Sequence, residues 1–168
     1  FYAENTPTDV FRISYIGRLY EFQSTALVEQ AVRELGLPHV ELNIHTPDCR
    51  PIPLSAVGDE LRRSSMALVL TNPNAKGMMT TKFFEALGCE KPILCTPSDN
   101  GLLTKTIRDT NAGLASSDMD EIKAFILEKY QEWQQNGFTR QAVINKEQFS
   151  RQQQAQQFEQ LFMQCSKR

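Results

Sequence analysis

Short runs of β-branched and apolar residues alternate along the chain with stretches in which apolar residues recur every three or four positions. The first pattern predicts buried strands, and the second predicts helices with one apolar face. The expected strands are residues 12–16, 40–44, 66–70, 93–95 and 111–115. The expected helices are residues 24–35, 55–65, 82–89, 102–107 and 118–136.

This alternation of strand and helix indicates an α/β fold. Right-handed crossovers between parallel strands give a doubly wound, Rossmann-like parallel sheet, here of five to six strands. Residues 66–70 are apolar at every position, which predicts the central strand because that strand is covered on both faces. Such sheets bind ligands beyond the carboxyl ends of their strands, so we expect the chemistry in the strand-to-helix turns.

The two ends of the chain differ from this pattern. Residues 1–10 show no period and the chain opens on Phe1, so we interpret them as a linker from an excised N-terminal domain, with residues 11–168 as one domain. Near the other end, six glutamines at positions 152–160 surround an apolar stripe at helical spacing: Ala155, Phe158, Leu161, Phe162 and Cys165. This pattern predicts a C-terminal surface helix whose apolar stripe is docked on the domain.

Composition excludes several classes of protein. The 168 residues are 40% hydrophobic and 23% charged, which is typical of a globular domain and not of a disordered chain. A net charge of -2 gives no long-range positive field for nucleic acid. No transmembrane run or signal-peptide pattern is present, which favours a cytoplasmic protein. Four scattered cysteines and two histidines make a structural zinc site improbable, and we interpret His39 and His45 as surface or edge residues.

The first strand-to-helix turn carries a glycine followed by an arginine. Gly17 lets the backbone approach a ligand, and the guanidinium of Arg18 can bind two phosphate oxygens at once. The alternative is that Gly17 only ends the strand and Arg18 lies on the surface. The turn lacks the G-x-G-x-x-G pattern, so an NAD-type pyrophosphate loop is not supported.

The third turn, residues 71–81, is polar, has no acidic residue and leads directly into a helix. Free N–H groups and the helix dipole make such a place suitable for an anion. Lys82 adds a positive charge, and Glu85 lies one turn further along the same side, where a carboxylate can accept hydrogen bonds from both hydroxyls of a ribose. The alternative is an ordinary surface pair of opposite charges.

Taken together, these segments resemble a known family. Residues 77–94, with Lys-x-x-Glu followed by small and apolar residues and then Lys-Pro before a buried strand, resemble the donor site of retaining, family-four-like glycosyltransferases of the GT-B type. Residues 15–19 resemble the first strand and Gly-Arg turn of that family, and residues 149–162 are similar to its closing helix. The resemblance covers nearly the whole chain after Val10.

The resemblance implies that the chain is the C-terminal half of such an enzyme, which binds a nucleotide-diphosphate sugar for transfer to an acceptor hydroxyl with retention. It implies a bacterial enzyme of cell-envelope polysaccharide or glycolipid synthesis. Acceptor binding and any peripheral membrane contact would belong to the missing N-terminal domain, so this half alone would bind donor without transferring sugar. No metal or other cofactor is expected.

Family roles carry over to matching positions. Glu85 corresponds to the glutamate that holds the donor ribose, and Arg18 to the arginine that meets the diphosphate. Arg18 and Lys82 would stabilise the leaving diphosphate as catalytic residues. The full set of expected donor-binding residues is Gly17, Arg18, Gly77, Met78, Met79, Thr80, Thr81, Lys82 and Glu85.

Two positions depart from the family pattern. Gly77 stands where the family often has a glutamate that contacts the sugar, and Gln23 stands where a diphosphate-binding lysine is common. Our hypothesis is that Lys82 supplies the charge missing at Gln23. Residues 51–54 follow the second strand and present backbone to a nucleobase in this interpretation, but the sequence does not identify the base, the sugar or the acceptor.

Other interpretations remain open. The pair Asp118 and Asp120 forms a D-x-D pattern, which elsewhere binds metal but here precedes an amphipathic helix and favours helix capping. A nucleotide-sugar epimerase half of the same architecture, or a non-enzymatic α/β interaction module, is the alternative to a glycosyltransferase. A phosphoacceptor domain is not supported, because the turns after the first and third strands lack the required acidic residues.

Overall fold

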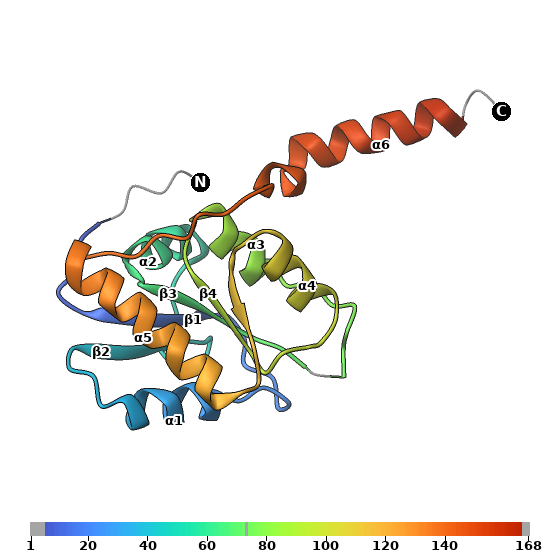
Figure 1. Ribbon diagram of the computed structural model, residues 1–168. Coiled ribbons are helices and arrows are strands. Elements are labelled where there is room, and N and C mark those ends of the chain that lie inside the picture. The colour runs from blue at the N-terminus through green and yellow to red at the C-terminus, as the bar shows by residue number, and fades with distance from the viewer. Residues whose placement is uncertain (1–5, 73, 166–168) are drawn as a thin grey trace.

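The computed structural model describes residues 6–72 and 74–165 and has the predicted α/β architecture (Figure 1). All pairings in its sheet are parallel, in the order β2-β1-β3-β4-β5. The strands are β1 (Phe11–Ile16), β2 (Val40–His45), β3 (Met66–Leu70), β4 (Ile93–Thr96) and β5 (Gly113–Ala115). The doubly wound parallel sheet expected from the sequence is therefore confirmed.

Helices cover both faces of this sheet. Five of them follow strands: α1 (Ala26–Leu35), α2 (Val57–Arg63), α3 (Thr81–Gly88), α4 (Leu102–Asp109) and α5 (Met119–Asn136). Buried side chains of α1 and α5 pack in one core cluster, and those of α2, α3 and α4 pack in the other. Short 3-10 turns, Leu54–Ala56 and Lys146–Phe149, precede α2 and the last helix, α6 (Arg151–Cys165).

The central strand explains why the sequence shows a continuous apolar run. All residues of β3 are buried. Met66, Leu68 and Leu70 join the cluster under α1 and α5, whereas Ala67 and Val69 join the opposite cluster. Side chains of a strand alternate between faces, so a strand covered on both faces must be apolar throughout.

The strand order places a topological switch point between β1 and β3. The chain leaves β1 through α1 to reach β2 on one side, and returns through α2 to place β3 on the other side of β1. The turns after β1 and β3 therefore diverge at the carboxyl edge of the sheet, which leaves a crevice where ligands bind in open α/β sheets.

The turn after β4 fixes the loop that precedes α3. The carboxylate of Asp99 accepts hydrogen bonds from the backbone N–H groups of Gly101, Leu103 and Thr104, so it caps α4. The backbone N–H of Leu102, the first residue of α4, donates a hydrogen bond to Lys76 O at 2.7 Å. A Cβ at Gly101 would lie 2.2 Å from that oxygen, so only glycine fits here. The N-terminus of α4 is therefore occupied by the protein itself.

The predicted linker is partly attached to the domain. Residues 6–10 carry no helix or strand, as expected, but Trp133 Nε1 of α5 donates to Thr8 O at 3.0 Å. Thr8 N donates in turn to Gly137 O at 2.8 Å. Gly137 ends α5 at φ 76°, in the left-handed conformation expected of its stop signal. Residues 1–5 of the predicted linker lie outside the described residues.

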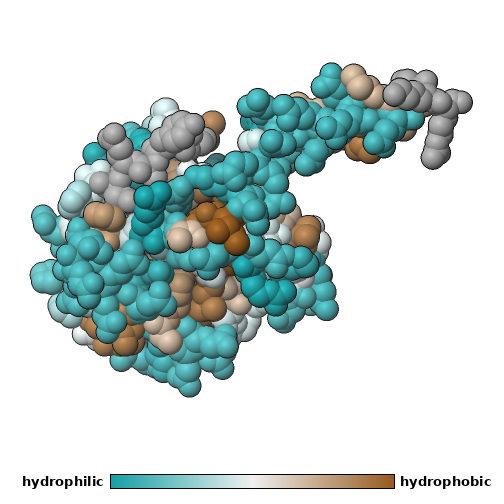
Figure 2. All heavy atoms as spheres, turned by 45° about the horizontal axis from the view of Figure 1, so that its top comes forward, coloured by the Kyte–Doolittle hydropathy of each residue, from teal (hydrophilic) through white to brown (hydrophobic). Residues whose placement is uncertain are grey.

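The C-terminal helix is correct in position but wrong in its packing. We expected the stripe of α6 to dock on the domain, yet Phe158, Leu161 and Phe162 are 61%, 55% and 70% exposed. The helix stands clear of the globular body (Figures 1 and 2). An amphipathic pattern shows that a helix has an apolar face but does not say which surface covers it. Within the described residues, no helix combines the length and apolarity needed to cross a bilayer.

The starts of helices α5 and α2 differ in how far they follow the sequence prediction. Asp118 caps α5, because its carboxylate accepts from the N–H groups of Asp120 and Glu121, and the capping interpretation of the D-x-D pattern is confirmed. The expected helix at residues 55–65 instead begins as a 3-10 turn and becomes α-helical only at Val57, without a side-chain cap.

Asp99→Asn tests the cap of α4. Burial alone would raise the pKa of Asp99, but hydrogen bonds from Thr104, Gly101 and Leu103 outweigh it and hold the pKa below 3.8. A lowered folded-state pKa means that this stabilisation is present above pH 3.8 and is lost as pH falls through the folded-state pKa. We expect Asp99→Asn to cost about 1–2 kcal/mol of unfolding free energy near neutral pH and much less in strong acid.

Denaturant unfolding at both pH values measures this difference. Asp109→Asn is the matched control, since Asp109 lies at the end of α4 and, among the described residues, its ion pairs are with Lys105 and Arg108 of the same helix. An equal loss of stability at neutral and acid pH would contradict the assignment of the cap.

Candidate functional site

A cavity of about 560 Å³ opens at the carboxyl edge of the sheet, at the switch point. Three segments form its walls: the turn after β1, the loop after β2, and the first turns of α3. The lining residues are Ile16, Gly17, Arg18, His45, Thr46, Pro47, Pro51, Ile52, Leu54, Val57, Thr81, Lys82 and Glu85. The structure thus brings together residues that lie more than sixty positions apart in the sequence.

Lys82 lies directly against the turn after β1. A Cβ at Gly17 would lie 2.5 Å from Lys82 Cε and 2.8 Å from Nζ, and Gly17 itself has φ 136°. The positive φ favours glycine at this position, whereas the flexible end of the Lys82 side chain would have to move to admit a Cβ. The close approach to a ligand expected at Gly17 stays a prediction, and the group that lies against Gly17 in the structure is the Lys82 side chain.

The ring of Tyr15 supports the same ammonium group. Lys82 Nζ lies 5.2 Å from the ring centroid, a distance at which a cation is attracted to the aromatic face. Tyr15 is fully buried, and its hydroxyl donates to Arg18 O at 2.5 Å. Burial raises the pKa of Tyr15 to about 12, so the hydroxyl keeps its proton at neutral pH. One side chain therefore positions Lys82 and the backbone of Arg18.

Tyr15 was not predicted from the sequence to be a functional residue. A tyrosine in a buried strand is ordinarily a core residue, and Tyr15 does belong to the core cluster under α1 and α5. Its position two residues before the Gly-Arg turn was the available signal. This position does not by itself indicate a functional role, because the contact between the ring and Lys82 is visible only in the folded structure.

Gln23 does not replace the charge of the family lysine. Its side-chain amide Nε2 donates to Leu70 O at 2.6 Å, and its Oε1 accepts from Tyr20 N at 3.1 Å. These bonds tie the turn after β1 to the end of β3. Gln23 therefore holds the two turns together, and the positive charge of the cavity comes from Arg18 and Lys82.

Lys82 and Glu85 share a half-buried environment. Burial lowers the pKa of Lys82 below 10.5, an effect that the charge of Glu85 partly reverses. Burial raises the pKa of Glu85 above 4.5, and Lys82 partly offsets this. The two opposite charges stabilise each other. Both groups have lost part of their hydration, which ligand groups of suitable polarity would replace. Arg18, by contrast, is exposed at the rim.

Four predicted site residues lie outside the cavity wall. Gly77 and Met78 are exposed, and Met78 shows 58% of its surface to solvent. Thr80 caps α3, since its hydroxyl accepts from Lys82 N at 3.3 Å. Met79 packs against the core cluster under α2, α3 and α4. Of the donor-binding residues predicted at 77–85, Thr81, Lys82 and Glu85 line the cavity, and all three belong to α3.

The loop after β2 forms one wall of the cavity. His45 lies at the end of β2, an edge strand as expected, and it also lines the cavity together with Thr46. Pro51, Ile52 and Leu54 also line the cavity. The loop predicted to face a nucleobase therefore shares the cavity with Lys82 and Glu85. The available sequence signal for His45 was its place directly after the strand expected at residues 40–44.

The described residues contain no group of three or more His, Cys, Asp and Glu side chains arranged to hold a metal ion. The charged groups of the cavity are two cations, Arg18 and Lys82, and one carboxylate, Glu85, beside His45. Two cations facing one cavity favour an anion with more than one charge, and a half-buried carboxylate favours a neighbouring group that donates hydrogen bonds. A phosphorylated molecule with free hydroxyls fits both requirements.

Comparison with known proteins supports the fold. No protein-family model matches the sequence, and no curated protein matches it. Among solved structures, a mutant of S. aureus TarM in complex with fondaparinux, alpha-GlcNAc-glycerol and UDP is similar over 76% of this chain. The TM-score is 0.51 at 12% sequence identity, and the match covers 30% of the TarM chain. This likeness shows that the chain shares its Rossmann-like α/β fold with part of TarM.

Proposed function

We propose that this chain binds the nucleotide-diphosphate sugar of a retaining, GT-B type glycosyltransferase. The observation that carries the proposal is the convergence of Arg18, Lys82 and Glu85 on one cavity at the switch point of the sheet. The two cations offer contacts to a diphosphate, and the carboxylate offers a contact to a ribose, as a nucleotide sugar would require.

The diphosphate would lie between Arg18 and Lys82. Guanidinium groups bind phosphate oxygens in pairs, and a lysine provides a compact charge. Lys82 is already held by Tyr15 and Gly17, so little side-chain entropy is lost when it meets a ligand. The cation-π contact does not neutralise the ammonium, which therefore remains available to an anion.

The ribose would lie against Glu85. Its carboxylate is half-buried and faces the cavity, and no hydrogen bond to it is found among the described residues. Two vicinal hydroxyls offer two donors to the two carboxylate oxygens. Beyond Glu85, Ile52, Leu54 and Val57 provide apolar surface for the flat face of a nucleobase.

Transfer of the sugar requires the bond between the anomeric carbon and the diphosphate to break. Negative charge then grows on the leaving phosphate, and cations placed there before the reaction stabilise the transition state by about 3 kcal/mol each. In this proposal Arg18 and Lys82 perform that role without a metal ion. The acceptor, and the groups that activate it, would bind to a further domain of the whole enzyme.

Lys82→Ala tests the diphosphate site. We expect at least about tenfold weaker binding of UDP, GDP or ADP, whichever binds the unmodified chain most tightly, since a charge-assisted contact is worth about 1.5–3 kcal/mol. Isothermal titration calorimetry measures the change. Lys105→Ala, which removes an exposed lysine of α4 outside the cavity, should leave the affinity unchanged. Equal affinities of the two variants would contradict the site.

Glu85→Gln tests the ribose contact separately. The unmodified chain should bind a nucleoside diphosphate more tightly than its 2′-deoxy analogue, since the deoxy compound leaves a carboxylate oxygen without a partner. The variant should lose most of this discrimination, because a neutral amide is a weaker acceptor. Competition calorimetry compares the two ligands, and preserved discrimination would exclude Glu85 from the ribose site.

The pH dependence of binding gives a further test. A nucleotide sugar keeps both phosphate charges over the range used, so changes in affinity report on the protein. Because the pKa of Glu85 is raised by burial, affinity should begin to fall above pH 4.5 as the pH is lowered, when Glu85 takes up a proton. Glu85→Gln should remove this acid limb, and an unchanged acid limb would assign it to another group.

A further inference from the structure

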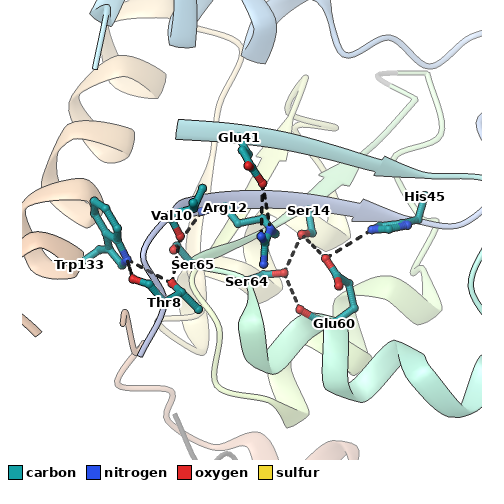
Figure 3. Close-up of polar contacts among 10 residues, drawn as sticks. All are labelled: Thr8, Val10, Arg12, Ser14, Glu41, His45, Glu60, Ser64, Ser65 and Trp133. Atoms are coloured by element: carbon teal, nitrogen blue, oxygen red, sulfur yellow. Dashed lines mark hydrogen bonds and ion pairs between the residues drawn. The ribbon is translucent and has the colours of Figure 1, made fainter. Parts of the chain in front are cut away.

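His45 connects the loop after β2 to helix α2. Its ring lies at the end of β2, where Nδ1 is 2.9 Å from Arg50 O and Nε2 is 3.3 Å from Glu60 Oε1. Figure 3 shows the ring directed toward the Glu60 carboxylate. A carbonyl oxygen only accepts hydrogen bonds, so Nδ1 must carry a hydrogen.

The other ring nitrogen then determines which form of the imidazole fits. Nε2 is shielded from solvent and has no well-aligned hydrogen-bond partner among the described residues, so its contact with Glu60 is electrostatic. In the neutral ring, a lone pair at Nε2 would face a carboxylate oxygen. In the imidazolium form, an N–H faces it instead, and both ring nitrogens meet an acceptor.

Glu60 is itself held in place from β1. Ser14 Oγ donates to Glu60 Oε1 at 3.3 Å, and Ser64 Oγ lies 2.6 Å from Ser14 Oγ and 2.7 Å from Glu60 O (Figure 3). Ser14 and Ser64 are buried. The carboxylate is therefore a fixed point on the body of the domain, to which a charged ring at position 45 is attracted.

The segment that His45 holds forms one wall of the cavity. Residues 46–50 close on themselves, with Thr46 N bonded to Cys49 O at 2.7 Å and Cys49 N bonded to Thr46 O at 3.2 Å. The bond from His45 to Arg50 O fixes the far side of this turn. Pro47, Pro51 and Ile52, which line the cavity, belong to the same loop or follow it directly.

Other charged groups surround the ring. Glu60 approaches from α2, Arg18 lies on the turn after β1, and Lys82 and Glu85 lie on α3 across the same cavity. Two of these groups are positive and two are negative, and within the part of the chain that the structure describes the ion pair of the ring is with Glu60. Loss of the imidazolium charge therefore acts first on the contact with Glu60.

We propose that His45 is a positioning residue: its imidazolium form links Arg50 O of the loop to Glu60 of α2 and so holds the cavity wall in the shape that receives the nucleotide. The ligand part of this inference rests on the proposed function, whereas the link itself does not. The protonated ring holds both acceptors, whereas the neutral ring keeps its Nδ1 bond to Arg50 O but loses its attraction to Glu60, so the loop is no longer tied to α2.

Hydrogen exchange at the Cys49 amide tests the link without any ligand. The protection factor of this amide, followed by NMR together with the His45 ring signal, should fall about fivefold as the ring loses its proton. In Glu60→Gln, the side-chain amide can donate to the neutral Nε2, so the link no longer needs a protonated ring. Protection of the Cys49 amide should then persist when the ring loses its proton. A merely space-filling ring would show neither effect. Protection that is independent of the His45 proton in both proteins would overturn the proposal.

Nucleotide binding then tests the role of the link. His45→Gln can reach Glu60 but leaves Arg50 O without its donor, and we expect about fivefold weaker binding of UDP-glucose, GDP-mannose or ADP-glucose, whichever the unmodified chain binds most tightly. Glu41→Gln is the matched control, because Glu41 is an exposed carboxylate of the same strand that pairs with Arg12. Unchanged affinity in His45→Gln would overturn the positioning role.

The two proposals fail in different ways. If the unmodified chain binds none of these nucleotide sugars, the proposed function fails and the ligand role of His45 falls with it, while the Cys49 amide still decides the link. If nucleotide binding is strong but insensitive to His45, the function stands and the positioning role is wrong.

Discussion

The contact between Lys82, the ring of Tyr15 and the backbone at Gly17 is the constraint on which the site depends. An ammonium group held against an aromatic face and a glycine keeps its charge but loses most of its freedom. It joins the turn after β1 to the start of α3, which are the two edges of the switch-point crevice. The diphosphate site proposed above depends on the position of this cation together with that of Arg18.

The fold that places this contact was largely predictable. Five strands and the helices between them follow from the two hydrophobic periods, and the parallel order follows from the handedness of crossovers. Residues 66–70 identify the central strand because a strand buried on both faces has no polar position. Ends of elements were less certain, since the 3-10 turn before α2 has no signal that separates it from a helix start.

The site was predictable only in part. Gly17, Arg18, Lys82 and Glu85 carry a pattern in sequence, and all four reach one cavity. Gly77 and Met78 do not, because the path of a loop depends on contacts such as Lys76 O with Leu102 N that sequence spacing cannot reveal. Tyr15 and His45 were missed for the same reason, as each acts through a partner distant in the chain. The packing of α6 failed because its apolar face specifies no covering surface.

NMR of the Lys82 side chain provides the most direct measurement of the central claim. Titration of the chain with UDP, GDP and ADP should shift the Lys82 Cε signal and the Gly17 amide signal together, saturating at one common ligand concentration for at least one nucleotide. The signal of Lys105, which lies outside the cavity on α4, should stay unchanged. Saturable binding that leaves Lys82 and Gly17 unperturbed, or no binding of any of the three nucleotides, would contradict this account.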